Sequence, residues 1–321
     1  MLIETSKVAI LGANGFIGRA VVESATSSRG ETTVHSMVRR TSSPPRPPGE
    51  LYAGDVRDIG SIRAAIRGMD AVIHAASYIG YDAALCRETN VAGTLNVVEA
   101  CAVEGVDRIV YVSTASVYGT GPHRGPAESE LEIRPESALS RSRADAENLV
   151  LDSGGTVLRP DMVLGAGDRW FVPGLMRFTD AVDGLVDGGT TRMSVVHVRD
   201  LGAAAFQLAV LDTPSPGAYN IAYEQPAEVR EIMDLLRVPA APSLPSVASA
   251  DARKLATNAG FTTRQFSLLA SDHWFDAGKL RSAIGPGLGE LVVDGTDRAW
   301  YQSLKPRSDL RWPPGRIVSK R

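Results

Sequence analysis

Short apolar runs alternate with amphipathic stretches over the first half of the chain. Apolar runs bounded by turn residues predict strands at Val8–Leu11, Thr33–Val38, Leu51–Ala53, Ala71–His74, Arg108–Ser113 and Thr156–Leu158. The stretches between them have a helical spacing of apolar positions and predict helices at Phe16–Ser24, Ile59–Ile66, Leu85–Val103 and Leu139–Leu151. Such regular alternation is typical of successive βαβ units, so we expect an α/β fold with a doubly wound parallel sheet.

The alternation loosens after residue 160. Helices are predicted near Leu201–Val210, Glu228–Leu236 and Ala277–Ile284, and a strand is predicted near Ala218–Ile221. We therefore expect a nucleotide-binding domain over residues 1–160, to whose sheet the chain returns at about 194–222. Residues 161–193 and 223–321 would form a smaller C-terminal substrate-binding lobe, with residues 305–321 as a packed arm or a disordered tail.

A glycine-rich turn joins the first predicted strand to the first predicted helix. Gly12, Gly15 and Gly18 lie in this turn, and glycines there allow a tight bend and the close approach of backbone N–H groups to a pyrophosphate. Arg39 and Arg40 follow the second strand, where an NAD-specific site would present an acidic residue to the ribose. A guanidinium matches a 2′-phosphate, so NADP(H) is favoured over NAD(H). The alternative is a pair of solvated arginines, because only five of the 34 basic residues are lysines.

Later segments stand in a familiar order. They are Gly-Asp-Val-Arg-Asp at 54–58, Val-Ile-His-Ala-Ala at 72–76, Asn-Val-Ala-Gly-Thr at 90–94, Val-Ser-Thr-Ala-Ser-Val-Tyr-Gly at 112–119, Leu-Arg-Pro at 158–160, Val-His-Val-Arg-Asp at 196–200 and Tyr-Asn-Ile at 219–221. Together with the glycine-rich turn, over roughly residues 7–285, this series resembles the extended short-chain dehydrogenase/reductase superfamily. The resemblance implies a doubly wound parallel Rossmann sheet, a smaller C-terminal substrate lobe and a nicotinamide cofactor.

The resemblance also implies roles for particular residues. It places the cofactor against Gly12, Asn14, Gly15, Phe16, Ile17, Gly18, Arg39, Arg40, Asp55, Val56, Ala75, Ala76, Arg143, Pro160 and Val163. It places the substrate against Ser116, Tyr118, Tyr78, His123 and Leu139. The hydroxyl of Thr114 would hold the substrate carbonyl, as the Ser or Thr does in the family.

The chain departs from the family at its general acid. Pro135 before the helix and Glu147 within it set the frame, in which Leu139 occupies the tyrosine position and Arg143 the lysine position. Arginine can still donate to ribose hydroxyls, whereas leucine has no proton to give. The pair Tyr301 and Lys305 has the four-residue spacing of the family motif, but it lacks the expected surroundings, and we interpret it as coincidence.

Two functions follow from a cofactor site that is retained without the family's general acid. The first is an NADPH-dependent ketoreductase, and in this respect the chain resembles angucyclinone ketoreductases of antibiotic biosynthesis that lack the tyrosine. The resemblance implies a polycyclic aromatic polyketide substrate whose own phenol, next to the carbonyl, supplies the proton. The alternative is a non-catalytic NADP(H)-binding sensor or regulatory protein. Epimerase or dehydratase activity is disfavoured because it requires the tyrosine as a base.

The other candidate proton donors are Tyr118, Tyr78, Tyr81 and His123, while His74 and His197 are expected to be core histidines.

The composition limits the binding partners and the cellular compartment that we expect. The 321 residues carry 34 basic and 37 acidic side chains and a net charge of −3, which gives no general attraction to nucleic acid or to an anionic membrane. Two cysteines, Cys86 and Cys101, imply no disulfide framework, and no apolar run is long enough to span a membrane. We expect a cytoplasmic protein that acts on a small molecule without a metal ion, with a homodimer as one option for its assembly.

Overall fold

A seven-stranded parallel sheet organises the fold. The computed structural model describes residues 5–28, 31–40, 46–236, 244–285 and 288–304. The sheet has the order β12 (Gly217–Ile221), β7 (Thr156–Pro160), β5 (Arg108–Val112), β4 (Ala71–His74), β1 (Thr5–Leu11), β2 (Glu31–Val38) and β3 (Glu50–Ala53). Every neighbouring pair is parallel. The predicted doubly wound α/β fold is thereby confirmed, and the strand order reverses between β1 and β4.

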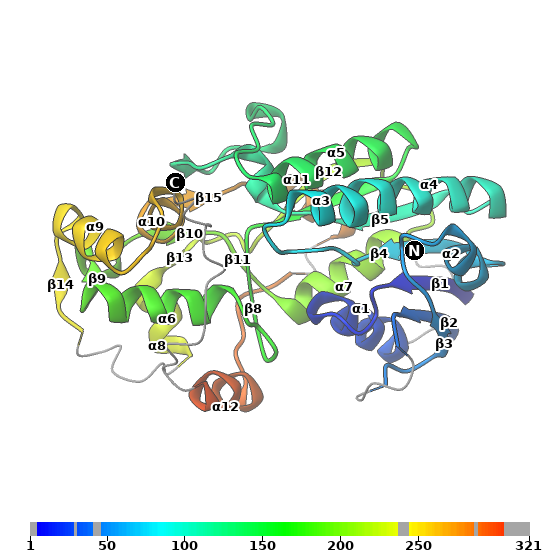
Figure 1. Cartoon of the computed structure of the whole chain (residues 1–321). Helices are drawn as coiled ribbons and strands as arrows, with labels where there is room; N and C mark the ends of the chain where they lie inside the picture. The colour runs from blue at the N-terminus through cyan, green and yellow to red at the C-terminus, as the bar shows by residue number, and fades with distance from the viewer. Residues whose placement is uncertain (1–4, 29–30, 41–45, 237–243, 286–287, 305–321) are drawn as a thin grey trace.

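Helices cover both faces of this sheet (Figure 1). One face carries α1 (Phe16–Ser27) and α7 (Val198–Ala209), and the other carries α2 (Ile59–Ile66), α4 (Gly93–Glu104) and α5 (Ala138–Asp152). Side chains alternate along a strand, so Val8 and Ile10 of β1 join the core under α1 while Ala9 and Leu11 join the core under α2. The strand is therefore apolar throughout, as expected for a sheet covered on both sides.

The predicted helix Leu85–Val103 is wrong as a single regular helix. The chain forms α3 (Ala83–Cys86), then a π-helical turn, η1 (Arg87–Ala92), and then α4. The wider turn includes Asn90, whose buried side chain bonds to other parts of the chain. Such turns often occur at functional sites, and apolar spacing alone does not reveal them.

A second lobe packs beside the sheet (Figure 1). It contains α6 (Phe171–Val182), α8 (Val229–Leu235), α9 (Ser249–Asn258), α10 (Thr263–Ala270) and α12 (Gly295–Ser303), while α11 (Gly278–Ile284) packs against β12. A small sheet has the order β13 (Ala227–Glu228), β10 (Arg192–Met193), β15 (His273–Trp274) and β6 (His123–Arg124). Two strand pairs complete the lobe, namely β8 (Met162–Leu164) with β11 (Val195–His197) and β9 (Leu185–Val186) with β14 (Ser246–Val247). Short helical turns are η2 (Ala115–Tyr118), η3 (Glu128–Glu130) and η4 (Asp187–Gly189).

The sequence did not predict α6, α9, α10 or α12. Helix α6 has Pro173 and Gly174 near its start, which usually signal a turn, although proline is tolerated in the first turn of a helix. The predicted tail, residues 305–321, lies outside the described residues.

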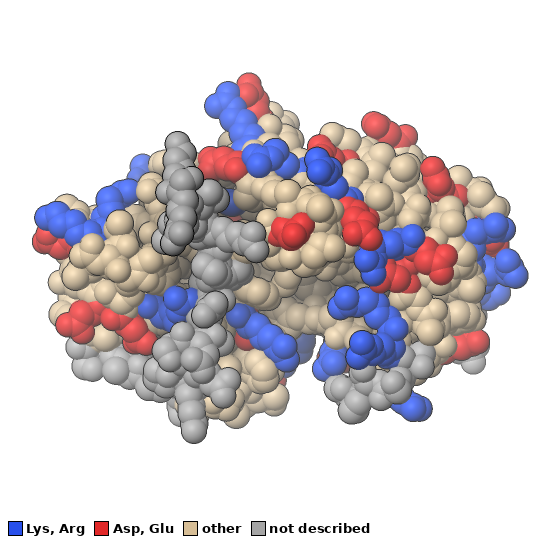
Figure 2. All heavy atoms as spheres, viewed as in Figure 1, with Lys and Arg blue, Asp and Glu red and all other residues tan. Residues whose placement is uncertain are grey.

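The surface shows no single-signed face in the view of Figure 2, where basic and acidic side chains are interspersed. In the described part of the chain, no helix is both long and apolar enough to cross a membrane.

Candidate active site

The glycine-rich turn has the geometry of a pyrophosphate cradle. Gly12 has a φ of +87°, and a Cβ on it would lie 2.8 Å from the Cα of Ala76. A Cβ on Gly18 would lie 2.1 Å from the carbonyl oxygen of Gly12. Gly15 caps α1 without a side-chain hydrogen bond, and no acidic residue lies in the first turn, which begins with Phe16 and Ile17. The N–H groups at this helix start are therefore available to an anion.

The adenosine end of the site is more open. Arg39 and Arg40 are exposed just beyond β2. The side chain of Arg57 bonds both carboxylate oxygens of Asp55, at 3.0 and 2.9 Å, and this bonding lowers the pKa of Asp55. Val56 is buried next to it. The roles of these residues toward adenine and a 2′-phosphate stay predictions.

Further predicted cofactor residues lie at or beyond the carboxyl ends of β4 and β7, the two strands on either side of β5. Ala75 and Ala76 follow β4, and Pro160 ends β7. Val163 lies in β8, three residues beyond Pro160. Ligands of open α/β sheets bind at this edge, near the reversal of strand order, so the placement is compatible with the predicted contacts.

Thr114 lies directly beyond β5 at the same edge. It caps η2, where its Oγ1 accepts a hydrogen bond from the backbone N–H of Ser116 at 3.2 Å and donates to the Ser116 hydroxyl at 3.2 Å. Both side chains are partly exposed. A pair of accessible hydroxyls here can hold a carbonyl oxygen.

Helix α5 presents Leu139 and Arg143 one turn apart. Leu139 is half-buried. Arg143 is 6% exposed, donates to the carbonyl of Val112, and has its guanidinium carbon 4.8 Å from the centroid of the Tyr111 ring. Its Nε has no hydrogen-bond partner, and no carboxylate pairs with it among the residues that the structure describes. Burial and the charge of Arg143 hold the pKa of His74 at about 3, so this neighbour is neutral.

A buried cation in a protein is normally paired with a negatively charged or hydrogen-bonding group. The hydroxyls and phosphates of a dinucleotide would supply one, so the residues present fit such a cofactor. Glu147, one turn beyond Arg143, bonds Arg159 instead, with 2.6 Å between Oε2 and Nη2.

Asn90 is a site residue to which the sequence analysis assigned no role. Its Nδ2 donates to the Ser142 hydroxyl at 2.9 Å and to the Tyr78 carbonyl at 3.0 Å, and its Oδ1 accepts from the Tyr78 N–H at 2.8 Å. These bonds join the π-helical turn to α5 and to the segment that follows β4. The segment Asn90–Thr94 was the available signal.

The predicted tyrosines are placed differently from one another. Tyr118 is 3% exposed, and its hydroxyl donates to Asn220 at 2.8 Å and accepts from Arg159 at 2.9 Å. These bonds hold the Tyr118 hydroxyl between β7 and β12, and its contact with a substrate stays a prediction. Tyr78 is half-buried with its ring against Gly80, and Tyr81 is 44% exposed.

His123 belongs to a group that we call the histidine cluster, defined as His123, which is partly exposed, and the buried side chains of His273 and Asp161. The Nδ1 of His273 lies 3.2 Å from Oδ2 of Asp161, and the two imidazole centroids are 5.0 Å apart. The Nε2 atoms of both histidines are buried and lack a hydrogen-bond partner in the described part of the chain. Asp161 and His273 had no role in the sequence analysis, and they are 112 positions apart.

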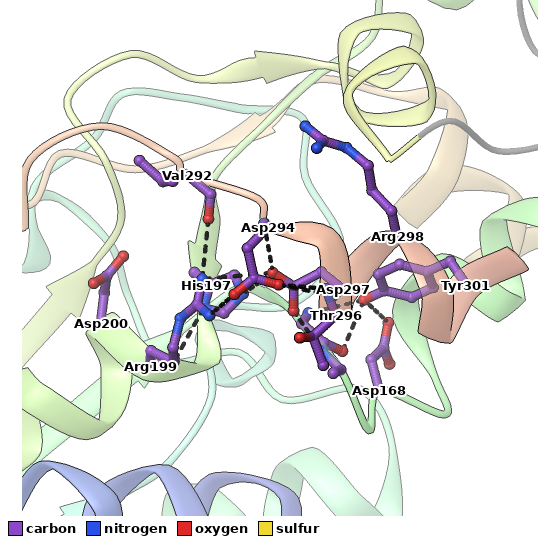
Figure 3. Close-up of polar contacts among 12 residues, drawn as sticks. Asp168, His197, Arg199, Asp200, Val292, Asp294, Thr296, Asp297, Arg298 and Tyr301 are labelled. Carbon is purple, nitrogen blue, oxygen red and sulfur yellow. Dashed lines mark hydrogen bonds and ion pairs between the residues drawn. The ribbon is translucent and has the colours of Figure 1, made fainter.

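Helix α12 is held by a second polar group, the α12 network of Asp168, His197, Arg199, Asp294, Asp297 and Tyr301 (Figure 3). Tyr301 is fully buried, accepts a bond from the Gly165 N–H at 2.8 Å and donates toward Asp168 at 3.2 Å. Its role is therefore structural, and Lys305 of the coincidental motif lies outside the described residues. The expectation that His197 is a satisfied core histidine is confirmed.

The family model described as NAD dependent epimerase/dehydratase family matches residues 8–222. The chain belongs to this family. It is 28% identical to a 2-alkyl-3-oxoalkanoate reductase of Stenotrophomonas maltophilia over 250 residues, which are 72% of this chain and 74% of that protein. It is 32% identical to a 3beta-hydroxysteroid-dehydrogenase/decarboxylase of Arabidopsis thaliana over 139 residues, which are 40% of this chain and 24% of that protein.

Solved structures agree on the fold. The UDP-Glc/GlcNAc 4-epimerase of Campylobacter jejuni superposes with a TM-score of 0.70 at 18% identity, covering 93% of this chain and 100% of that one. RMD from Pseudomonas aeruginosa, complexed with NADPH, gives a TM-score of 0.67 at 20% identity, covering 92% and 98%. Membership of the family makes the chain an NAD(P)-dependent protein of the oxidoreductase type.

Proposed function

We propose that the chain is an NADPH-dependent ketoreductase that works without a catalytic tyrosine. The observation that carries the proposal is Leu139 on the helix beside Thr114. Epimerases and dehydratases of this architecture begin by removing a proton from a substrate hydroxyl, and leucine cannot accept one. Reduction needs no such base, because the proton can come from the substrate, from water or from another side chain. The Stenotrophomonas relative, a reductase, supports this choice.

The chain's own residues would hold and polarise the carbonyl. Bound NADPH would supply the hydride to the carbonyl carbon. The Thr114 hydroxyl would donate a hydrogen bond to the carbonyl oxygen and stabilise its developing negative charge. Arg143 would hold the nicotinamide ribose and add a fixed positive charge nearby.

The substrate class we propose is a polycyclic aromatic polyketide, angucyclinone-like, in antibiotic biosynthesis. Leucine in place of a phenol removes a polar group and leaves an apolar surface for a flat ring system. A phenol next to the substrate carbonyl would be one source of the proton, since its hydrogen bond is already formed. A 2-alkyl-3-oxoalkanoate is the competing substrate suggested by the bacterial relative.

Turnover and binding are to be measured on the same preparation. NADPH oxidation is followed with three ketones: an aryl ketone with a peri hydroxyl, its methyl ether and a 2-alkyl-3-oxoalkanoate. NADPH and NADH binding are measured by nicotinamide fluorescence. We expect oxidation with an aryl ketone and tighter binding of NADPH. Tight binding without turnover on any ketone would contradict the proposal and favour the non-catalytic sensor.

Replacement of the carbonyl donor tests the site directly. Thr114→Val should lower kcat/KM roughly tenfold, equivalent to about 1.4 kcal/mol, because the carbonyl oxygen loses a donor. Thr114→Ser is the matched control and should retain most activity. Equal activity in all three proteins would exclude Thr114 from the site.

Restoring the family residue tests whether leucine is adapted to the reaction. Leu139→Tyr should leave activity unchanged or lower it, because the phenol would fill space meant for the substrate. A large gain in turnover would mean that the site had simply lost its acid.

A further inference from the structure

The histidine cluster lies at the sheet edge that carries Thr114. Strands β5 and β7 are parallel neighbours with Val112 paired to Leu158. Thr114 and Asp161 follow these two positions by two and three residues, so both emerge at the carboxyl edge of the same strand pair. His273 and His123 are paired directly across β15 and β6 of the small sheet. The cluster therefore joins the second lobe to the edge where the carbonyl would be held.

The turn that begins with Thr114 also ends at the cluster. Thr114 caps η2, and Gly119 follows its last residue. Its carbonyl faces both imidazoles, an arrangement that favours their protonated forms. A Cβ on Gly121 would lie 2.5 Å from the N–H nitrogen of His123 and 3.3 Å from the ring of His273. The backbone between Thr114 and His123 is thus packed closely against the two rings.

Hydrogen-bond accounting separates these two histidines from His35 and His197, although the buried Nδ1 of His74 also lacks a partner in the described part of the chain. Buried polar atoms in proteins almost always have partners. His197 uses Nδ1 and Nε2, and His35 lies 2.7 Å from the Ala65 carbonyl through Nδ1 and 3.5 Å from Glu50 through Nε2. His273 is 1% exposed, yet only its Nδ1 is bonded, to Asp161. Its Nε2 has no hydrogen-bond partner in the described part of the chain, while the Gly119 carbonyl faces the ring, and this setting favours the protonated imidazole that a proton donor requires.

The neighbouring charges act on the pKa values of His273 and His123. Burial lowers the pKa of His273, but the Asp161 carboxylate and the Gly119 carbonyl together raise it, so the net shift is upward, against an opposing contribution from Arg264 of α10. Burial and the adjacent His273 lower the pKa of His123, while Asp161 acts in the opposite sense. His123 is partly exposed as a residue, whereas its Nε2 is buried like that of His273. A protonated His123 would be the stronger acid of the two.

We propose that the histidine cluster supplies the proton that the missing tyrosine would have given. The inference rests on the proposed ketoreductase function. As hydride reaches the carbonyl carbon, the carbonyl π electrons move to oxygen, which forms an O–H bond as the Nε2–H bond of His123 breaks. His123 then takes the proton of His273, and solvent restores it. His123 is the donor, and His273 with Asp161 positions and charges it.

The substrate pair separates the two proton sources. The methyl ether of the peri-hydroxy ketone has no phenol, so its reduction requires a proton from the protein or water. We expect the wild type to reduce both ketones, with kcat falling as pH rises through the pKa of the cluster. His123→Gln should lower kcat for the methyl ether at least tenfold with little change in KM or in NADPH binding. Reduction of the phenol alone, with none of the ether, would overturn the inference and assign the proton to the substrate.

Positioning by Asp161 is tested by the pH profile. Asp161→Asn removes the charge that raises the pKa of His273, so the alkaline limb of the kcat profile should move to lower pH. His35→Gln is the matched control, a paired histidine on β2, and should keep the wild-type profile. An unchanged limb in Asp161→Asn and His123→Gln would contradict the inference.

One readout does not depend on turnover. Proton NMR titration of the five histidines should show His273 with a pKa above its ordinary value in the wild type and a lower pKa in Asp161→Asn. A His273 pKa at or below the ordinary value would overturn the inference even without a known substrate. Failure of the proposed function would appear separately, as no oxidation of NADPH with any ketone.

Discussion

Two buried histidine–aspartate pairs in this molecule have nearly the same separation but differ at the other ring nitrogen of the histidine. We call a pair completed when that nitrogen has a hydrogen-bond partner and incomplete when it has none. His197 and Asp297 are 3.1 Å apart, and His273 and Asp161 are 3.2 Å apart. In the α12 network the other ring nitrogen of His197 accepts the Arg199 N–H at 3.1 Å, and Asp297 also accepts from Ala166 at 2.8 Å (Figure 3). In the histidine cluster two Nε2 atoms stay without partners. The completed pair is built for stability, and the incomplete pair keeps a hydrogen-bonding group in reserve.

The completed network also supports the cofactor side of the molecule. It holds the loop after β8, where Gly165 and Asp168 bond Tyr301. A Cβ on Gly167 of this loop would lie 3.3 Å from the Phe16 ring of the glycine-rich turn. The last described helix is therefore connected, through one loop, to the cradle expected to hold the pyrophosphate.

The largest expected effect comes from breaking the completed pair. Asp297→Ala removes the partner of a buried histidine and of the Ala166 N–H, so the free energy of unfolding should fall by about 3 kcal/mol. Urea denaturation measures it. Asp161→Ala is the comparison within the incomplete pair and should cost less. Equal losses would remove the distinction between the two pairs.

Removal of a single hydroxyl from the α12 network should cost about 1–2 kcal/mol. Tyr301→Phe keeps the ring but leaves the Gly165 N–H and the Asp168 carboxylate without this partner. Tyr219→Phe is the control, since it removes a buried hydroxyl bonded to Ser215 at 2.6 Å in another part of the fold. NADPH binding should weaken in Tyr301→Phe and not in Tyr219→Phe. A loss of stability without any change in binding would leave α12 with no influence on the cradle.

The raised pKa of His273 gives the stability a pH dependence of its own. A histidine whose folded pKa exceeds its unfolded value stabilises the protein fully below the unfolded pKa of about 6.5, and that contribution disappears as pH rises through the folded pKa. The slope cannot exceed about 1.4 kcal/mol per pH unit for one proton. Urea denaturation from slightly acidic to slightly alkaline pH should show it in the wild type and not in Asp161→Asn. The same slope in both proteins would mean that Asp161 does not raise this pKa.

The smallest effect on the stability of the fold is expected from a substitution of His123. His123→Phe replaces a ring with an unpaired nitrogen by an apolar ring beside Phe275, whose centroid is 5.2 Å away. Removal of an unsatisfied buried group is close to neutral or stabilising, so thermal unfolding should occur at the same or a higher temperature while activity falls. A large loss of stability would mean that His123 is a structural residue.

Local patterns were sufficient for the sheet and the cofactor turn. Strand Ala71–His74 and helix Ile59–Ile66 were predicted with their observed bounds, because buried parallel strands and amphipathic helices carry their signals in adjacent residues. The π-helical turn at Asn90 and helix α6 were not predicted, since one depends on tertiary hydrogen bonds and the other contains residues typical of turns.

The sequence by itself determined that the chain has a doubly wound nucleotide-binding fold, and it predicts that Leu139 occupies the position of the family's tyrosine. Both are properties of side chains read in order along the chain. Only the tertiary structure decided which histidines have partners for both ring nitrogens. His273 bonds Asp161, which is 112 positions away in the sequence, and His197 bonds Asp297, which is 100 positions away. Partners so far apart leave no periodic signal, and their pairing is set by how the second lobe packs on the sheet. Leu139 in the sequence raises the question of the proton source, and the histidine cluster that we propose as its answer is formed only in the folded chain.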